Sequence, residues 1–326
     1  RRAQEVTTFF ADLSNNEQRE WIDELLQRTT YTDGNVAICL LDTGVTAAHP
    51  LLAQAINLDH VQAVNSTWGN GDHQGHGTEM AGIALYNNLK EALLGKTKIE
   101  IPQKIEPPTG GNDPELYGAV TEQAVSLAEI ANPFVHRVIC MAVTSPEYNT
   151  FDGSPTSWSA AVDSITSGAD EENVKRLFVV SAGNVYPEEL GKLSFPDANT
   201  LHCVESPGQA WNAITVGAYS NDVNITDTFF KGYNPVAEAG AMSPYNSTSE
   251  LWNSKWPVKP VYCTIKIPKV AEDNPKSCMR IFPIIADVLV FLYDHSKYCS
   301  FREISKHPLQ AYRALCILEM SLQTTF

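Results

Sequence analysis

Three residues of this chain carry the side chains of an acyl-transfer site. Asp42 follows the apolar run at 36–41, His76 lies between two glycines, and Asn184 comes soon after the apolar run at 177–181. A buried carboxylate can hold an imidazole in one tautomer, and the imidazole can take a proton from a nucleophile. An amide can stabilise the oxyanion that then develops. The residue types therefore predict nucleophilic attack on a carbonyl carbon.

Asp42 has two other interpretations, because it opens the tripeptide Asp42-Thr43-Gly44. Aspartic peptidases use the same tripeptide, but their chemistry needs two carboxylates that share a proton. No second Asp-Thr-Gly or Asp-Ser-Gly occurs in the sequence, so only a homodimer would supply the second carboxylate. An ordinary turn at Gly44 is the other alternative. We favour a role beside His76 because the other two motifs accompany Asp42.

His76 is the predicted general base. Gly75 and Gly77 flank it, and glycines allow backbone and substrate to approach closely. Asp72, His73 and His76 could instead suggest a metal cluster, but no second pair of ligands completes one. The histidines His49, His60 and His73 are interpreted as surface or supporting residues.

Asn184 is the predicted oxyanion donor. Its motif, Ser181-Ala182-Gly183-Asn184, follows an apolar strand pattern, so a tight turn would present the amide at the strand end. A simple turn or helix stop at Gly183-Asn184 is the alternative. Ser181 is not the predicted nucleophile, because the small residues after it are interpreted as the turn that carries Asn184.

These segments, in this order, resemble the subtilisin-like serine peptidases (subtilases) over roughly residues 30–260. The resemblance implies that Asp42 orients the histidine, His76 is base and then acid, and Asn184 binds the oxyanion. It also implies a peptide or protein substrate that adds a strand beside Cys140–Thr144, although an interior strand without substrate contact is a close alternative. Calcium stabilises many subtilases, but no acidic loop signals a site here, and no cofactor is predicted.

The nucleophile segment of that family, Gly-Thr-Ser, does not occur in these residues. Other serines are poor substitutes, since they lie before the Lys259-Pro260 pair or between bulky or charged residues: Ser247, Ser249, Ser277, Ser296 and Ser300. The predicted function is a serine endopeptidase by descent, impaired in this chain. The alternative is a non-catalytic, peptide-binding or regulatory pseudopeptidase.

Apolar periodicity predicts an α/β fold with a mostly parallel sheet covered by helices on both faces. A capping box at Ser14 and Glu17 predicts a first helix. Strands are predicted at 35–41, 137–143, 176–181 and 211–219, and helices at 78–94, 117–130 and 156–166. Active sites of such sheets lie beyond the carboxyl ends of the strands, where Asp42 and Asn184 are expected.

Composition divides the chain at about residue 260. Net charge is −17 over residues 1–260 and +2 over 261–326, which together make −15, and the second part contains no glycine. We therefore predict a helical extension at 1–30, an incomplete peptidase domain at 31–260 and a divergent tail at 261–326. The tail is expected to be mainly helical, with one helix near 301–322, and poorly packed on the body.

The overall composition excludes several classes of function. A net charge of −15 disfavours binding to nucleic acids and anionic membranes, and no apolar stretch is long enough to span a bilayer. Seven cysteines without a Cys-x-x-Cys pair predict neither a zinc site nor a disulfide framework, which favours the cytoplasm. Arg1-Arg2-Ala3 lacks a methionine, so the true start is expected upstream. The oligomeric state is not indicated.

Overall fold

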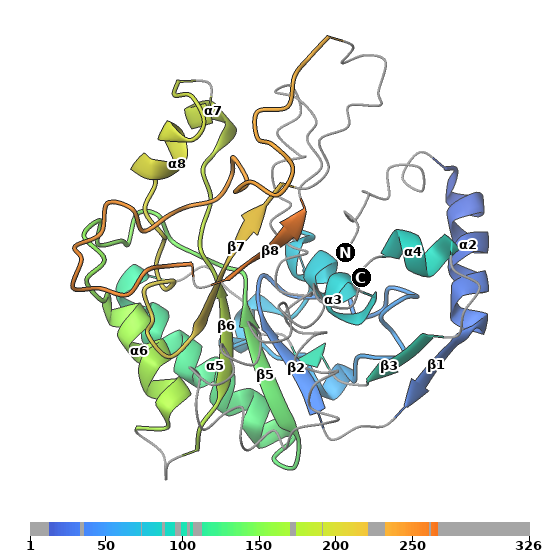
Figure 1. Ribbon diagram of the computed structural model, residues 1–326. Coiled ribbons are helices and arrows are strands. Elements are labelled where there is room, and N and C mark those ends of the chain that lie inside the picture. Colours follow the sequence, from blue (N-terminus) through green and yellow to red (C-terminus); the bar gives the residue numbers. More distant parts are fainter. Residues whose placement is uncertain are drawn as a thin grey trace, which may run out of the picture.

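Short apolar runs form the strands of one parallel sheet in the computed structural model (Figure 1). The structure describes residues 13–32, 36–72, 74–86, 89–94, 99–102, 105–106, 113–169, 174–190, 192–220, 232–260 and 262–266. The six strands lie in the order β4-β2-β5-β6-β7-β8, and all neighbours are parallel. Their bounds are β2 Val36–Leu41, β4 Ile105–Glu106, β5 His136–Met141, β6 Leu177–Ser181, β7 Ile214–Tyr219 and β8 Tyr262–Lys266.

Helices α5 and α6 cover one face of this sheet. Residues of β2, β5 and β6 alternate between the two faces, and one set packs on α5 (Tyr117–Ala131) and α6 (Ser157–Ser167). Phe178 and Val162 are both fully buried in that layer. Thr156 caps α6 through a capping box with Ser159, which satisfies backbone N–H groups at the helix start.

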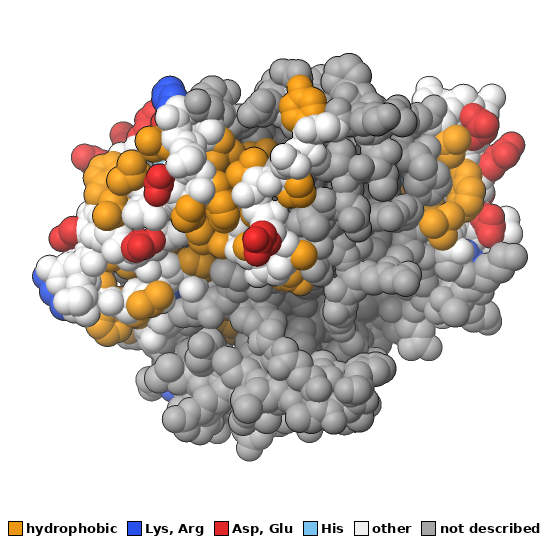
Figure 2. All heavy atoms as spheres, turned by 45° about the horizontal axis from the view of Figure 1, so that its top comes forward, with side chains coloured by type: hydrophobic (Ala, Val, Ile, Leu, Met, Phe, Trp, Pro, Cys, Tyr) orange, Lys and Arg blue, Asp and Glu red, His pale blue; other side chains and the backbone are white. Residues whose placement is uncertain are grey.

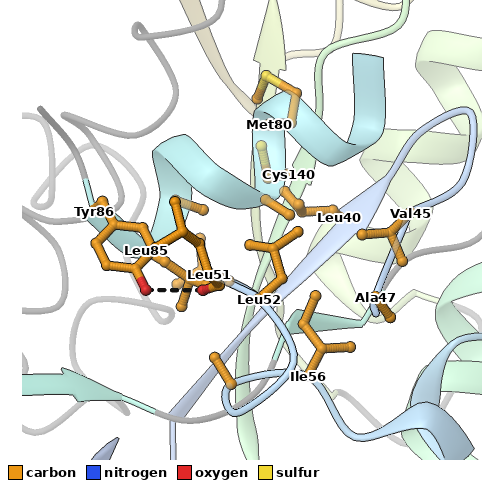
Figure 3. Packing of buried hydrophobic residues seen from close by; sticks show 14 of the residues in the cluster. Leu40, Val45, Ala47, Leu51, Leu52, Ile56, Met80, Leu85, Tyr86 and Cys140 are labelled. Carbon is orange, nitrogen blue, oxygen red and sulfur yellow. Dashed lines mark hydrogen bonds between the residues drawn. The ribbon is translucent and has the colours of Figure 1, made fainter. Parts of the chain in front are cut away.

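The opposite face packs on α2 (Asn15–Gln27), α3 (His76–Tyr86) and α4 (Leu89–Leu94). Figure 3 shows Met80 of α3 above Leu40 and Cys140 of the sheet. At the far end of α3, the Tyr86 hydroxyl donates a 2.8 Å hydrogen bond to the Leu51 carbonyl. Helices on both faces confirm the predicted fold class.

Smaller elements complete the described fold. A separate two-stranded parallel sheet pairs β1 (Thr29–Thr32) with β3 (Ile99–Pro102). Short helices occupy the connections, and their bounds are α7 Pro187–Leu190, α8 Asp197–Leu201, η1 Leu58–His60, η2 Ser66–Trp68 and η3 Pro114–Leu116. No helix within the described ranges has the length and apolar character needed to cross a membrane.

The helix predicted at 78–94 is described in two parts, α3 up to Tyr86 and α4 from Leu89, and residues 87–88 between them lie outside the described residues. Helix α3 begins two residues earlier than predicted, so His76 is its first residue. Both parts bury residues in the same core, among them Met80 and Leu93, as the single apolar pattern predicts.

The capping box at Ser14 and Glu17 is confirmed, and Leu25 of α2 is fully buried in the main core. At the other end, β8 begins just past the boundary predicted at residue 260 and pairs with β7 at the sheet edge. The sheet therefore continues into the first residues of the predicted tail. The predicted helix near 301–322 lies outside the described residues, and the division of the chain stays a prediction.

The carboxyl ends of all six strands lie at one edge of the sheet because the strands are parallel. From β2 the chain passes through α3 on one face, and from β4 it passes through α5 on the other. In α/β sheets, ligands bind where the connections diverge in this way. Figure 2 tilts this edge toward the viewer, and on that face hydrophobic side chains gather on the left, among acidic, other polar and a few basic ones.

Candidate active site

Asp42 directly follows β2 and is only 6% exposed. Its Oδ1 accepts a 2.7 Å hydrogen bond from the Thr43 backbone N–H. This bond limits the rotation of the carboxyl group, which can therefore hold a neighbouring donor in a fixed orientation.

His76 supplies that neighbour. Its Nδ1 lies 2.5 Å from Asp42 Oδ1, and its side chain is 15% exposed. The predicted contact between the two residues is present. A proton on Nδ1 that is held by the carboxylate leaves Nε2 as the basic nitrogen, which is the arrangement that general-base catalysis requires.

Glycines allow the turn after Asp42 to pack against the first turn of α3. Gly44 has φ +116°, a conformation that L side chains rarely adopt. A Cβ at Gly77 would lie 2.0 Å from the Gly44 carbonyl oxygen and 3.2 Å from Asp42 Oδ1. The close approach of these two backbones brings the carboxylate and the imidazole together.

Gly77→Ala is expected to separate the two catalytic candidates, because the new methyl group has no space beside the Gly44 carbonyl. We expect the free energy of unfolding in urea to fall by about 1–3 kcal/mol. Gly82→Ala in the same helix is the matched control, since nothing lies within 4 Å of its added Cβ. That change should be neutral or stabilising by up to about 1 kcal/mol. Equal stability of the two variants would contradict this account.

Asn184 lies beyond the end of β6, in the turn that begins at Gly183. Gly183 has φ +93°, and Asn184 forms an isolated antiparallel bridge with Asn246. Within the described residues, the buried Oδ1 of Asn184 has no hydrogen-bond partner. Buried polar atoms are usually satisfied, so this oxygen is available to accept a hydrogen bond from a ligand, whereas binding of an oxyanion uses the side-chain NH2 group.

Glu205 supports this turn, and no local sequence pattern points to it. Its carboxylate accepts a 2.5 Å hydrogen bond from the Thr144 hydroxyl and a 3.4 Å hydrogen bond from the Asn184 backbone N–H. Glu205 is 4% exposed, and burial raises the pKa of its carboxyl. A Cβ at Gly183 would collide with this side chain. Glu205 therefore links the ends of β5 and β6.

The strand segment Cys140–Thr144 is only partly where the resemblance placed it. Cys140 and Met141 are interior residues, with exposed fractions of 1% and 3%. Val143 is exposed, and Thr144 is half-buried. The first two residues belong to the core, and only the residues after β5 are accessible to a ligand.

The other candidate residues that the structure describes have environments of their own. Ser247 is fully buried, and the hydroxyl of Ser249 accepts a hydrogen bond from the Lys259 N–H. His49 accepts a hydrogen bond from Leu51 N–H, and burial lowers its pKa. His60 is half-buried. His73, Ser277, Ser296 and Ser300 lie outside the described residues. Across the described ranges, no three His, Cys, Asp or Glu side chains form a group that could hold a metal ion.

Comparison with known proteins supplies a family for this geometry. The sequence model described as "Subtilase family" matches residues 33–262, which is more than half of the chain. No curated protein sequence matches it. Among solved structures, the chain is similar to the nisin leader peptidase NisP from Lactococcus lactis, with a TM-score of 0.35 and 15% sequence identity. That match covers 62% of this chain and 63% of NisP, so this chain spans less than two thirds of it.

Proposed function

Because the chain belongs to the subtilase family, we propose that its site is, by descent, that of a serine endopeptidase. Asp42 orients His76, His76 transfers the proton, and Asn184 stabilises the oxyanion. The observation that supports this proposal most is the 2.5 Å contact between His76 Nδ1 and Asp42 Oδ1. The substrate is a peptide or protein.

In the ancestral reaction, a serine hydroxyl passes its proton to His76 Nε2 as its oxygen attacks the peptide carbonyl. Asn184 donates its amide to the oxyanion, and the protonated imidazole then gives its proton to the leaving amine. Water releases the acyl group by the same sequence of steps. Asp42 stays ionised throughout and stabilises the imidazolium.

The chain itself is proposed to be nearly inactive. None of its 326 residues forms the Gly-Thr-Ser segment that carries the nucleophile in this family. His76 can lower the barrier only by taking a proton from a hydroxyl placed beside it. Without that hydroxyl, the acyl-enzyme route is closed.

A pseudopeptidase that binds peptides is the second candidate function. The absent Gly-Thr-Ser favours it, and so does the unpaired side-chain oxygen of Asn184, which can accept a hydrogen bond from a peptide N–H. In that case the chain binds an extended peptide without cleaving it, and Asn184→Ala weakens the binding. We further propose a reducing compartment such as the cytoplasm, which suits the free cysteines Cys140 and Cys203.

A fluorophosphonate probe tests the proposal, because it labels only a serine that an adjacent base activates. We expect labelling and casein turnover at the level of the His76→Ala variant. Strong labelling that disappears in His76→Ala would mean that one of the dismissed serines is the nucleophile. Peptide binding measured by calorimetry then distinguishes an inactive peptidase that keeps its cleft from a chain that has lost it.

A further inference from the structure

Asp72 is a part-buried carboxylate that the sequence suggested only as part of a rejected metal cluster. It lies four residues before His76 and accepts five hydrogen bonds. No proton transfer in the proposed reaction uses it. Its contacts divide between its two oxygens, and the two sets reach different parts of the site.

One oxygen, Oδ2, caps the start of α3. It accepts a 2.8 Å hydrogen bond from the Thr78 backbone N–H and a 2.6 Å hydrogen bond from the Thr78 hydroxyl. The first N–H groups of a helix have no partner within the helix. Asp72 therefore satisfies one of them in the helical turn that begins with His76.

The other oxygen, Oδ1, faces the loop before His76 and the turn after Asp42. It accepts hydrogen bonds from the backbone N–H groups of Gln74 and Gly75, at 3.1 and 2.8 Å. It also lies 3.1 Å from the Thr43 hydroxyl. That hydroxyl also lies 3.3 Å from Asp42 Oδ1, so both carboxylates lie within reach of its one proton.

Thr43 completes a connection between the two catalytic candidates. Its hydroxyl oxygen accepts a 3.4 Å hydrogen bond from the Gly77 N–H, beside His76. The Thr43 hydroxyl thus donates a hydrogen bond to Asp72 and accepts one from Gly77 of α3. The backbone N–H of Thr43 donates to Asp42. Burial alone would raise the pKa of the Asp72 carboxyl, but hydrogen bonds from Thr78, Gly75 and Gln74 hold it below its ordinary value. The carboxylate is therefore charged and fully engaged at neutral pH.

We propose that Asp72 is a positioning residue that fixes the turn of Asp42 against the helix of His76. Its Oδ2 sets the position of the imidazole, and its Oδ1 sets the position of the carboxylate through Thr43. This inference rests on the proposed function, since it concerns the same Asp42–His76 pair. A simple helix cap is the competing explanation, and it would involve Oδ2 alone.

Two substitutions separate these explanations. Asp72→Asn keeps the size of the side chain but replaces one carboxylate oxygen with an NH2 group, which cannot accept a hydrogen bond. The variant therefore loses the hydrogen bonds to either Oδ1 or Oδ2. Thr43→Val removes the hydroxyl link and leaves the cap on Thr78 intact. Asp113→Asn is the matched control, because Asp113 caps η3 by accepting from the Glu115 N–H and is exposed.

The readout is the Nδ1 proton of His76 in nitrogen-15 NMR of histidine-labelled protein, assigned by its loss in His76→Gln. We expect this proton to exchange with water at least about tenfold faster in Asp72→Asn and in Thr43→Val, and at the wild-type rate in Asp113→Asn. A tenfold change is the size of one lost hydrogen bond. Thermal unfolding of each variant reports whether the fold survives.

An unchanged exchange rate in folded Asp72→Asn and Thr43→Val would overturn the proposal and leave Asp72 as a helix cap only. If Asp72→Asn does not fold, the exchange rate in Thr43→Val tests the proposal, since that variant keeps the hydrogen bonds between Asp72 and Thr78. A wild-type protein without this protected proton would instead contradict the Asp42–His76 contact, and with it the proposed function. The two failures are therefore distinguishable.

Discussion

Casein hydrolysis should appear when residues 261–326 are replaced by the serine-bearing segment of an active subtilase. The described part of the chain already holds His76 2.5 Å from Asp42, so the graft needs to supply only the hydroxyl. We expect turnover in the graft to fall roughly 10⁶-fold on His76→Ala, the loss recorded for subtilisin, itself a member of this family. Hydrolysis of casein, followed by release of soluble peptides, measures both effects.

Asp42→Asn in the same graft should lower kcat by roughly 10⁴-fold, because the amide favours the wrong imidazole tautomer. Gly82→Ala is the neutral control, since its added methyl meets nothing within 4 Å. A graft that folds, binds peptide and still fails to cleave would show that the Asp42–His76 pair is not a catalytic pair. Equal turnover by the original chain would show that it already has a nucleophile.

The sequence predicts the elements of this fold well where burial imposes a regular pattern. Strand β6 is buried along its whole length, and its continuous apolar run was recognised for that reason. The helix predicted at 78–94 is described as α3 and α4 on either side of residues 87–88, and both pack on the core that its apolar pattern predicts. The edge strand β8 was not predicted, since its partner β7 is more than forty residues away in the sequence.

The candidate site shows the same division. Asp42 and His76 stand at the ends of strongly patterned elements, so their chemistry could be predicted from neighbouring residues. Glu205 depends on Thr144, a contact across 61 positions, and no local pattern records it. Asp72 is close to His76 in sequence, but its role depends on the distant Thr43. Residues that support a site through tertiary contacts are thus the ones that sequence reasoning misses.

Lys259 is another residue whose role depends on tertiary contacts, and it should make the stability of the protein vary with pH in the alkaline range. Its side chain is 3% exposed, and its Nζ donates to the carbonyls of Ala210 and Ala213 at 2.7 and 3.1 Å. Burial lowers the pKa of Lys259 from 10.5 to about 8, although the charge of Asp163 opposes this shift. The folded protein therefore carries a costly charge at neutral pH.

The sign of the effect follows from proton binding in the two states. Between pH 8 and 10.5 the unfolded chain keeps the Lys259 proton and the folded chain loses it, so stability rises with pH. Lys259→Met removes this pH-dependent contribution to the free energy of unfolding. We expect the stability of the wild type relative to Lys259→Met, measured by urea unfolding, to increase by about 2–3 kcal/mol from pH 7 to pH 10.

Lys255→Met is the control, because Lys255 lies in the same segment but is exposed, with its Nζ 4.7 Å from the centre of the Trp256 ring. Its stability relative to the wild type should change by less than about 0.5 kcal/mol over the same pH range, as is usual for surface substitutions. A difference between the wild type and Lys259→Met that stays constant with pH would mean that Lys259 keeps its proton in the folded protein. The carbonyls of Ala210 and Ala213 would then stabilise the buried charge as well as water does.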